Sequence, residues 1–370
     1  MGQRGRIGGR IWGMAGAIFL VLITGLTANA VEERFFRIGT AATTGTYFQL
    51  GGVLASALSK PEGGRDCAYG GSCGVPGLIV LAQATQGSIE NVLEVGKGQL
   101  DSALSQSDIA YWAYTGAAAT PKRCTGGKPS DANADGASLL KKTGPITSLR
   151  AIAGLYPEHL HIVVSAETSI TRLHDLRGKR VSLGQPESGT LADARLVLEA
   201  AGLSECSIKA RYLGLAQAVE ALRGGEIDAF FLVAGAPVPA ITEFAGSAPI
   251  RLLPIDPDLA RRIIDKFPFF TADTIAPGLY PGQESEVPSL QITALWVVSE
   301  TVPEDLVYAI TKGLWSEPTR RLLEAAHPLG ARIRLATALQ GVVVPLHPGA
   351  ARFYRENSMT LPATLPPVIR

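Results

Sequence analysis

Two loops rich in glycine, serine and threonine carry the residue types best suited to hold an anion. They are residues 39–46 and 184–190, and each lies between a strand-like run and a segment with helical spacing of apolar residues. The first N–H groups of a helix have no partner within it and carry partial positive charge. Such a loop can therefore bind a carboxylate without a basic side chain. Two loops facing one another across a cleft would suit a small molecule with one or more carboxylates.

Local interpretations of the same residues stay open. Thr190 with Asp193 fits a capping box that would only satisfy its own helix. Ser88 likewise fits an N-cap, with Glu90 placed favourably near the helix start. Neither loop matches the phosphate-binding pattern G-x-x-x-x-G-K-[ST] or the dinucleotide fingerprint, so nucleotide phosphates are disfavoured.

Candidates for catalysis and metal binding are few. His159 and His161 would share a face of a strand, but beyond Glu158 no further ligand stands nearby, so we assign them structural or surface roles. Asp108 is a candidate general base, and more simply a turn or ligand-orienting carboxylate. No G-x-S-x-G elbow is present. We therefore expect no catalytic residue, no metal site and no cofactor.

Composition indicates a folded, nearly neutral protein. The chain has 370 residues, 46% of them apolar and 18% charged, and its formal net charge is +1. This length suits two lobes of about 150 residues each. The charge argues against a protein that neutralises many phosphates, so we expect no nucleic-acid partner.

The N-terminus has the three parts of a secretory signal peptide. Arg4, Arg6 and Arg10 precede the apolar run 11–26, and an A-x-A ending closes at Ala30. We predict that residues 1–30 are a signal peptide, cleaved after Ala30, and that the mature protein is periplasmic. A retained N-terminal anchor is the alternative.

Four cysteines in an exported chain favour disulfides. Cys67 and Cys73 flank a glycine-rich stretch and could close a short loop, which leaves Cys124 and Cys206 as a long-range pair or as free thiols. The sequence alone does not choose between these pairings.

The chain alternates strand and helix patterns, as expected of an α/β protein, and two segments resemble each other. Each runs strand, small polar loop, helix. Residues 98–104 and 225–231 then match as a second correspondence, in which an acidic turn leads into a buried strand. Residues 149–156 and 250–253 look like the strands that cross between the halves. This organisation predicts lobe I from 31–156 and 246–370, lobe II from 157–245, and a cleft between hinged lobes.

Several motifs along the chain resemble the TAXI group of solute-binding proteins (TRAP-associated extracytoplasmic immunogenic). The matching stretches are residues 38–47, 87–91, 106–111, 155–158, 176–182, 188–190, 228–231, 280–283 and 345–350. The resemblance spans nearly all of the mature chain, in order. It implies a type II periplasmic-binding-protein fold, with two α/β lobes joined by a two-crossing hinge.

The resemblance also implies what the protein does. A member of this group is not an enzyme; it binds glutamate, glutamine or a related dicarboxylate and delivers this anionic solute to a TRAP membrane permease. Carried over by position, the implied ligand-binding residues are Thr43, Gly45, Thr46, Tyr47, Ser88, Asn91, Gln106, Ser107, Tyr156, Ser188, Gly189 and Thr190. Ala41, Ala42 and Thr44 replace part of the group's glycine-rich first loop, and Gln49 replaces a frequent proline. The added methyl groups restrict close backbone approach, which points to a ligand or pose different from that of glutamate.

Two other classes of protein, an exported enzyme and a structural or adhesion protein, are alternatives to the receptor. An exported hydrolase or transferase on the same fold would use Asp108 or a histidine in the cleft, and would place a perturbed acid or base beside a nucleophile. A structural or adhesion protein would have a shallow cleft and no response to small molecules.

Overall fold

The computed structural model describes residues 33–65, 67–117 and 136–362, together with Gly2. The predicted signal peptide lies outside these ranges apart from Gly2, and so do residues 118–135. The described residues from Glu33 onward belong to one compact unit. Within the described ranges, no helix combines the length and the apolar character that a membrane span needs.

The first strand–loop–helix segment opens a repeat unit of three parallel strands. In chain order its main elements are β1 (Arg34–Gly39), α1 (Thr46–Leu58), β4 (Leu78–Gln83), α2 (Ser88–Gly96), β5 (Ser102–Gln106) and α3 (Ser107–Thr115). β1 lies between β4 and β5 and is parallel to both. Leu50, Leu54 and Leu58 recur at helical spacing and are fully buried, so α1 packs an apolar face against the sheet.

The second segment opens an equivalent unit. Its elements are β7 (Arg180–Ser182), α5 (Gly189–Ala200), β8 (Lys209–Arg211), α6 (Leu215–Arg223), β9 (Ala229–Ala234) and α7 (Pro239–Ser247). β7 lies between β8 and β9 and is parallel to both. α5 ends just before Gly202, whose φ of +70° is the left-handed conformation that commonly stops a helix.

Each unit contains an equivalent Arg–Asp ion pair, whose Asp directly precedes the third strand of the unit. The N–H and Nε of Arg37 donate to Oδ2 of Asp101, at 2.8 and 3.0 Å. The N–H and Nε of Arg180 donate to Oδ2 of Asp228, at 2.7 and 3.1 Å. The predicted correspondence of residues 98–104 with 225–231 is thus confirmed as a true structural repeat.

Two long antiparallel strands connect the repeats. They are β6 (Leu149–Ser165) and β12 (Val287–Ser299), in the sheet order β4-β1-β5-β12-β6-β9-β7-β8. The first part of β6 pairs with β12 and the second part pairs with β9. Residues 250–253, which were expected to return to the first lobe, contain a short strand, β10 (Ile250–Leu252), which pairs with residues 163–165 of β6. Their assignment to the first lobe stays a prediction. The lobe boundaries at 156 and 245 stay a prediction.

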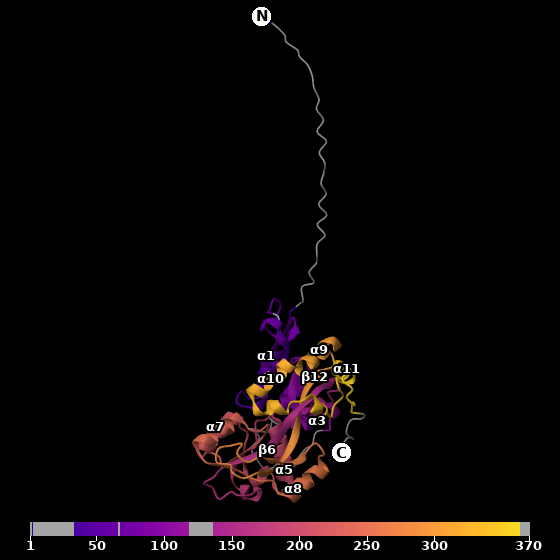
Figure 1. Ribbon diagram of the computed structural model, residues 1–370. Coiled ribbons are helices and arrows are strands. Elements are labelled where there is room, and N and C mark those ends of the chain that lie inside the picture. Colours follow the sequence, from indigo (N-terminus) through magenta and orange to yellow (C-terminus); the bar gives the residue numbers. More distant parts are fainter. Residues whose placement is uncertain (1, 3–32, 66, 118–135, 363–370) are drawn as a thin grey trace. The chain divides into compact units, whose positions relative to one another are not determined.

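The other elements cover this frame. The remaining helices and strands are β2 (Ser59–Lys60), β3 (Val75–Pro76), α4 (Gly136–Thr143), α8 (Pro257–Lys266), β11 (Thr271–Ile275), α9 (Glu304–Leu314), α10 (Glu317–Ala326) and α11 (Pro348–Glu356). Short 3-10 turns lie at Cys67–Tyr69, Leu173–Leu176, Glu205–Ser207, Pro328–Arg332 and Leu335–Thr337. Figure 1 shows α1, α9 and α10 towards one end of β6 and α5, α7 and α8 towards the other.

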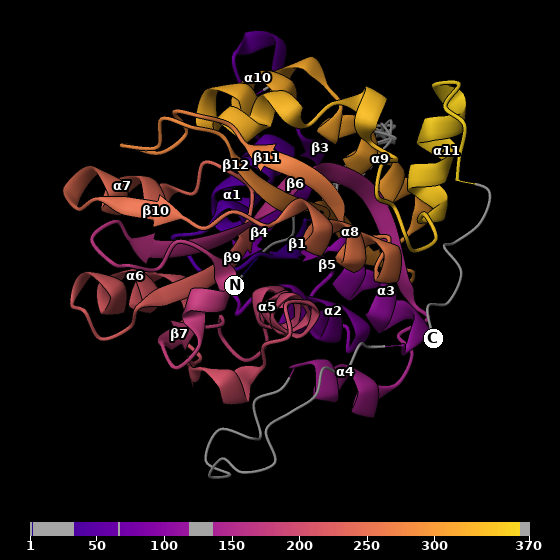
Figure 2. The ribbon, with the colours of Figure 1, turned by 90° about the horizontal axis from the view of Figure 1, so that it is seen from below.

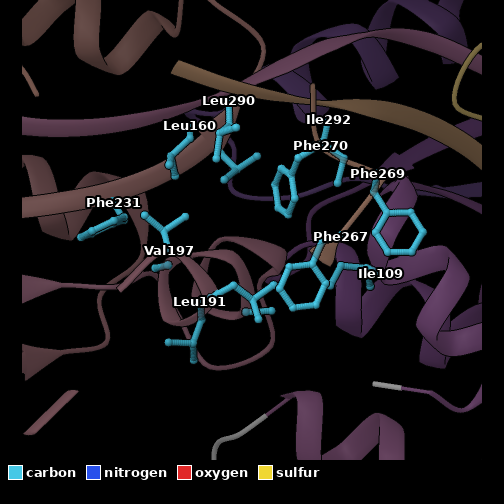
Figure 3. Packing of buried hydrophobic residues seen from close by; sticks show 14 of the residues in the cluster. Ile109, Leu160, Leu191, Val197, Phe231, Phe267, Phe269, Phe270, Leu290 and Ile292 are labelled. Carbon is cyan, nitrogen blue, oxygen red and sulfur yellow. The ribbon is translucent and has the colours of Figure 1, made fainter. Parts of the chain in front are cut away.

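The largest apolar core crosses from one repeat to the other. Ile109 of α3, Leu191 of α5 and Phe267 after α8 belong to one cluster, which Figure 3 shows in part. Together with the repeated strand order and the two long connecting strands, this arrangement is a type II periplasmic-binding-protein fold. It has two α/β lobes, one built on each repeat, joined by β6 and β12.

Cys67 and Cys73 form a disulfide, which closes the short loop that the sequence allowed for. Cys206 is disulfide-bonded too, while Cys124 lies outside the described residues. In the part of the chain that the structure describes, no group of three or more His, Cys, Asp or Glu side chains could hold a metal ion.

Candidate functional site

One cavity of about 90 Å³ lies between the two repeats, and both line it. Ligand clefts commonly measure about 300–1,000 Å³, so this one suits a small solute. The residues that the first repeat contributes are Ala41, Ala42, Gly45, Thr46, Tyr47, Gln86, Gly87, Ser88 and Gln106. Those of the second repeat are Gly184, Gln185, Ser188, Gly189, Thr190, Leu213, Gly214, Leu215, Ala218 and residues 230–234. Glu158 of β6 completes the lining. The two predicted loops therefore share a cavity, and no Lys, Arg or His is among the described residues that line it.

The start of α1 offers free backbone donors. Its N-cap residue, Gly45, has no side chain to cap the helix. Among the described residues, no acceptor binds the N–H groups of Thr46 and Tyr47. The Thr46 hydroxyl instead donates to the carbonyl of Gly235 at 2.9 Å, a direct bond between the repeats. The amides of α1 are thus open to a ligand while its hydroxyl is engaged.

The start of α5 has the same character. Ser188 is its N-cap, and Ser188 Oγ accepts from the Leu191 N–H at 3.2 Å. The capping-box interpretation of Thr190 and Asp193 is therefore wrong, because Thr190 Oγ1 accepts from Val233 N–H at 3.1 Å. Within the described ranges, the N–H groups of Gly189 and Thr190 bind no acceptor.

The start of α2 is already occupied. The carbonyl of Glu187 accepts from the N–H groups of Ile89 and Glu90, at 3.2 and 3.3 Å. Ser88 is the first helical residue rather than the N-cap that it could have been, and its Oγ accepts from Gln106 N–H at 3.1 Å. Figure 2 shows α2 and α5 side by side, as this contact requires. The α2 amides hold the two repeats together and are not available to a solute.

Carboxyl groups are buried where the repeats meet. Gln106 Nε2 donates to Asp193 Oδ2 at 2.7 Å, and the buried carboxyls of Asp193 and Asp108 interact with each other electrostatically. Burial raises the pKa of Asp108 to about 6. Burial, followed by the charge of Asp108, raises the pKa of Asp193 well above its usual range. A proton shared by two such carboxyls avoids two adjacent negative charges.

Glu158 is the charged group of the cavity itself. Its side chain is 2% exposed, and its Oε2 accepts from the Tyr47 hydroxyl at 2.7 Å. Burial raises the pKa of Glu158 to about 8, opposed by the Tyr47 hydrogen bond and assisted by Asp108. Burial and the Glu158 carboxyl raise the pKa of Tyr47, so this hydroxyl stays protonated.

The structure brings most of the predicted binding residues to the cavity. Those that line it are Gly45, Thr46, Tyr47, Ser88, Gln106, Ser188, Gly189 and Thr190. Thr43, Asn91, Ser107 and Tyr156 are predicted binding residues that do not line it. Asn91 is buried and donates to the carbonyls of Thr40 and Leu104, at 2.7 Å each, so it joins α2 to the strands. Tyr156 is buried beside Gly235.

Sequence reasoning missed two parts of the lining. Glu158 was weighed only as a metal ligand, although it stands in a matching motif at 155–158 beside Tyr156. The apolar wall of Leu213, Leu215 and Phe230 was not recognised as part of a binding site. Helical and strand spacing do not separate a core face from the wall of a cavity, so no local signal marked this wall.

The residues of the catalytic alternative lie elsewhere. Asp108 is fully buried and does not line the cavity. His159 Nε2 lies 3.0 Å from Asp273 Oδ2, and His161 Nε2 lies 2.8 Å from the Tyr280 hydroxyl. Burial lowers the pKa of His161 to about 3, so it stays neutral. These histidines support the strands around β6.

Comparison with known proteins identifies a family. The model described as the NMT1-like family matches residues 38–123 and 124–357. Among solved structures, the chain is similar to the periplasmic aliphatic sulphonate binding protein SsuA from Escherichia coli, with 17% identity, a TM-score of 0.43 and coverage of 88% of this chain and 84% of that one.

Two further solved structures show similar values. The alkanesulfonate-binding protein SsuA from Xanthomonas axonopodis pv. citri, bound to MOPS, has 16% identity, a TM-score of 0.44 and coverage of 92% of this chain and 97% of that one. A putative L-cystine ABC transporter from Listeria monocytogenes has 12% identity, a TM-score of 0.42 and coverage of 82% and 99%. Similarity at this level says nothing about the solute of this chain.

Proposed function

Because the chain belongs to the NMT1-like family and its two repeats enclose one cavity, we propose that it is an exported receptor for a small carboxylate-bearing solute. The solute binds between the lobes and favours their closed arrangement, since it contacts both at once. The protein is not an enzyme: it carries the solute unchanged.

The observation that carries this proposal is the pair of open helix starts. The N–H groups of Thr46 and Tyr47 come from one repeat, and those of Gly189 and Thr190 from the other. They border one cavity that no cationic described residue lines. Backbone amides at helix starts bind carboxylates well, because their donors are unused and the helix dipole adds positive potential.

The cellular setting comes from the sequence. The signal-peptide pattern supports export to the periplasm after cleavage at Ala30, and the TAXI resemblance supports delivery to a TRAP-type permease. The same resemblance names glutamate, glutamine and related dicarboxylates as the first solutes to test. Residues 31–156 with 246–370 and residues 157–245 are the bodies proposed to close on the solute.

The alternative of an exported hydrolase or transferase is weaker than the receptor. It needed Asp108 or a histidine in the cleft, and the described residues that line the cavity include neither. The buried carboxyl that does line it, Glu158, has no Ser, Thr or Cys nucleophile hydrogen-bonded to it in the described part of the chain.

A ligand panel tests the proposal. Mature protein beginning at Val31 is mixed with amino acids and with mono- and dicarboxylic acids, and melting temperature and radius of gyration are followed. A solute at about 100 times its Kd should stabilise the protein by about 2.7 kcal/mol and reduce the radius. The amide of the same acid, which lacks the carboxylate, is the matched control. The receptor proposal is wrong if no acid in the panel changes either quantity.

A further inference from the structure

Glu158 is chemically distinct from everything else in the cavity lining. Among the described residues that line the cavity, it is the one side chain able to carry a formal charge near neutral pH. Its Oε2 binds the Tyr47 hydroxyl, whereas its Oε1 accepts no hydrogen bond within the described ranges. An unpartnered oxygen on a carboxyl side chain that is 2% exposed, at the wall of a cavity, is suited to accept a hydrogen bond from a ligand.

The groups around Glu158 are acids or phenols. Tyr47 of α1, Tyr156 of the same strand, Asp108 of α3 and Asp193 of α5 all influence it or are influenced by it. Burial raises the pKa of Glu158 to about 8. An ammonium group placed at Oε1 would reverse this shift and favour the ionised carboxylate, because opposite charges stabilise each other most strongly in a buried site. A second carboxylate on the solute would find no cationic side chain among the described residues that line the cavity.

Part of the cavity wall is apolar. Leu215 and Ala218 of α6, Phe230 of β9 and the neighbouring Leu213 and Leu232 line it. All five pack in or against one hydrophobic cluster of the second repeat. The side chains of this wall offer no hydrogen-bond donor, so the wall is better suited to an aliphatic or aromatic group than to a charged one.

We propose that the solute is an α-amino acid with an uncharged, apolar side chain. Its carboxylate binds the amides at the starts of α1 and α5, its ammonium group binds Glu158, and its side chain lies against the wall formed by α6 and β9. This inference rests on the proposed receptor function and narrows it, since it excludes the dicarboxylates. Glu158 thereby becomes a residue that determines specificity.

Matched ligands separate the three contacts. Titration calorimetry compares L-alanine, L-valine, L-leucine and L-phenylalanine with their des-amino acids, and with L-glutamate and glutarate. We expect at least one apolar amino acid to bind 10-fold or more tightly than its des-amino partner and than L-glutamate. Affinity should also rise between pH 6.5 and 8.5, because ligand binding needs the ionised Glu158, and binding at pH 7 should release a proton to the buffer.

The variant Glu158→Gln keeps the shape of the side chain and its contact with Tyr47. It should lower affinity for the amino acid at least 10-fold and abolish the rise with pH. Glu187→Gln is the matched control, since Glu187 uses its backbone carbonyl at the start of α2 and its side chain does not line the cavity. Unchanged melting temperatures for both variants exclude a folding defect, and Tyr47→Phe, which leaves the carboxyl in place, offers a second, milder perturbation.

The outcomes distinguish this inference from the proposed function. If glutarate, L-glutamate or a des-amino acid binds as tightly as the amino acids, or if Glu158→Gln binds the amino acid unchanged, the inference is overturned and the receptor proposal stands. If none of these acids binds, both are overturned.

Discussion

The two repeat units of this protein share their frame and differ at the cavity. Away from the cavity, Arg37 with Asp101 and Arg180 with Asp228 make equivalent contacts between the first and third strands of each unit. At the cavity, the first repeat presents polar side chains such as Tyr47 and Gln106, whereas the second adds an apolar wall that includes Leu215.

The difference shows how one supersecondary unit can serve both halves of an asymmetric site. Each unit places the start of one helix, α1 or α5, at the same cavity, and each start supplies open amides. The side chains around these starts then decide which chemical groups the solute carries. The start of α2 takes a third role, since the Glu187 carbonyl occupies it and joins the repeats.

The largest expected difference is between two pH responses. One is that of the buried carboxyls of Asp108, Asp193 and Glu158, and the other is that of the ion pairs Arg37–Asp101 and Arg180–Asp228. The raised pKa values of Asp108, about 6, and Glu158, about 8, mean that folded protein holds protons that the unfolded chain has lost. Their contribution to stability is complete below about pH 4 and is lost as pH rises through 6 and 8. The free energy of unfolding in urea should fall by a few kcal/mol between pH 4.5 and 8.5.

The variant Asp193→Asn removes one carboxyl of the buried pair and should weaken this fall. It leaves an amide that can still bond to Gln106 and Asp108, so the fold should persist. If the free energy of unfolding of the wild-type protein rises over the same pH range, the buried carboxyls are not protonated in the folded protein and the account is contradicted.

Gly189→Ala breaks the start of α5. A Cβ at this position would lie 1.3 Å from Gln106 Oε1, and Gln106 is buried and holds Asp193. The clash should cost about 1–3 kcal/mol of unfolding free energy and remove the ligand response. Gly52→Ala, within α1, is the control: its Cβ would meet no atom within 4 Å, and higher helix propensity should leave stability equal or slightly increased. Equal melting temperatures for the two variants would refute the predicted clash.

The hydroxyls of Thr46 and Thr190, at the starts of α1 and α5, allow a further comparison of the two repeats. Thr46→Val loses the bond to the Gly235 carbonyl, and Thr190→Val loses the bond from the Val233 N–H. Each should cost about 1 kcal/mol or slightly more, since a buried backbone group loses its partner. Thr46→Val should also favour the open arrangement, because the Thr46 hydroxyl bonds across to the other repeat whereas the Thr190 hydroxyl bonds within its own. Scattering of the ligand-free protein measures this, and an unchanged radius would argue against it.

The smallest effects are expected at the outer pairs. Asp101→Asn and Asp228→Asn should lower the melting temperature by similar, small amounts, because the two contacts are equivalent and both are partly exposed to solvent. Arg180 lowers the pKa of Asp228, so this contribution is present above about pH 4 and is lost as pH falls below it. A marked difference between the variants would show that the repeats are not energetically equivalent.

Much of the frame could be predicted from the sequence, and less of the site. The loops at 39–46 and 184–190 and the acidic turns before β5 and β9 are local patterns, and the structure places them as expected. The loop residues that reach the cavity depend on which residue caps the helix, and Ser188 rather than Thr190 caps α5. Asn91 turned out to bind strand carbonyls, a contact that depends on how α2 packs. The role of Glu158 depends on β6 passing between both repeats, where the pairing with β12 is irregular near Tyr156.

Amide NMR during a ligand titration tests the central claim most directly. The account predicts large shifts for the amides of Thr46, Tyr47, Gly189 and Thr190 as they bind the carboxylate, and small shifts for Ile89 and Glu90, whose N–H groups the Glu187 carbonyl already holds. The probe is the acid that most raises the melting temperature, and its amide is the control. Large shifts at Ile89 and Glu90 without any at the starts of α1 and α5 would contradict it.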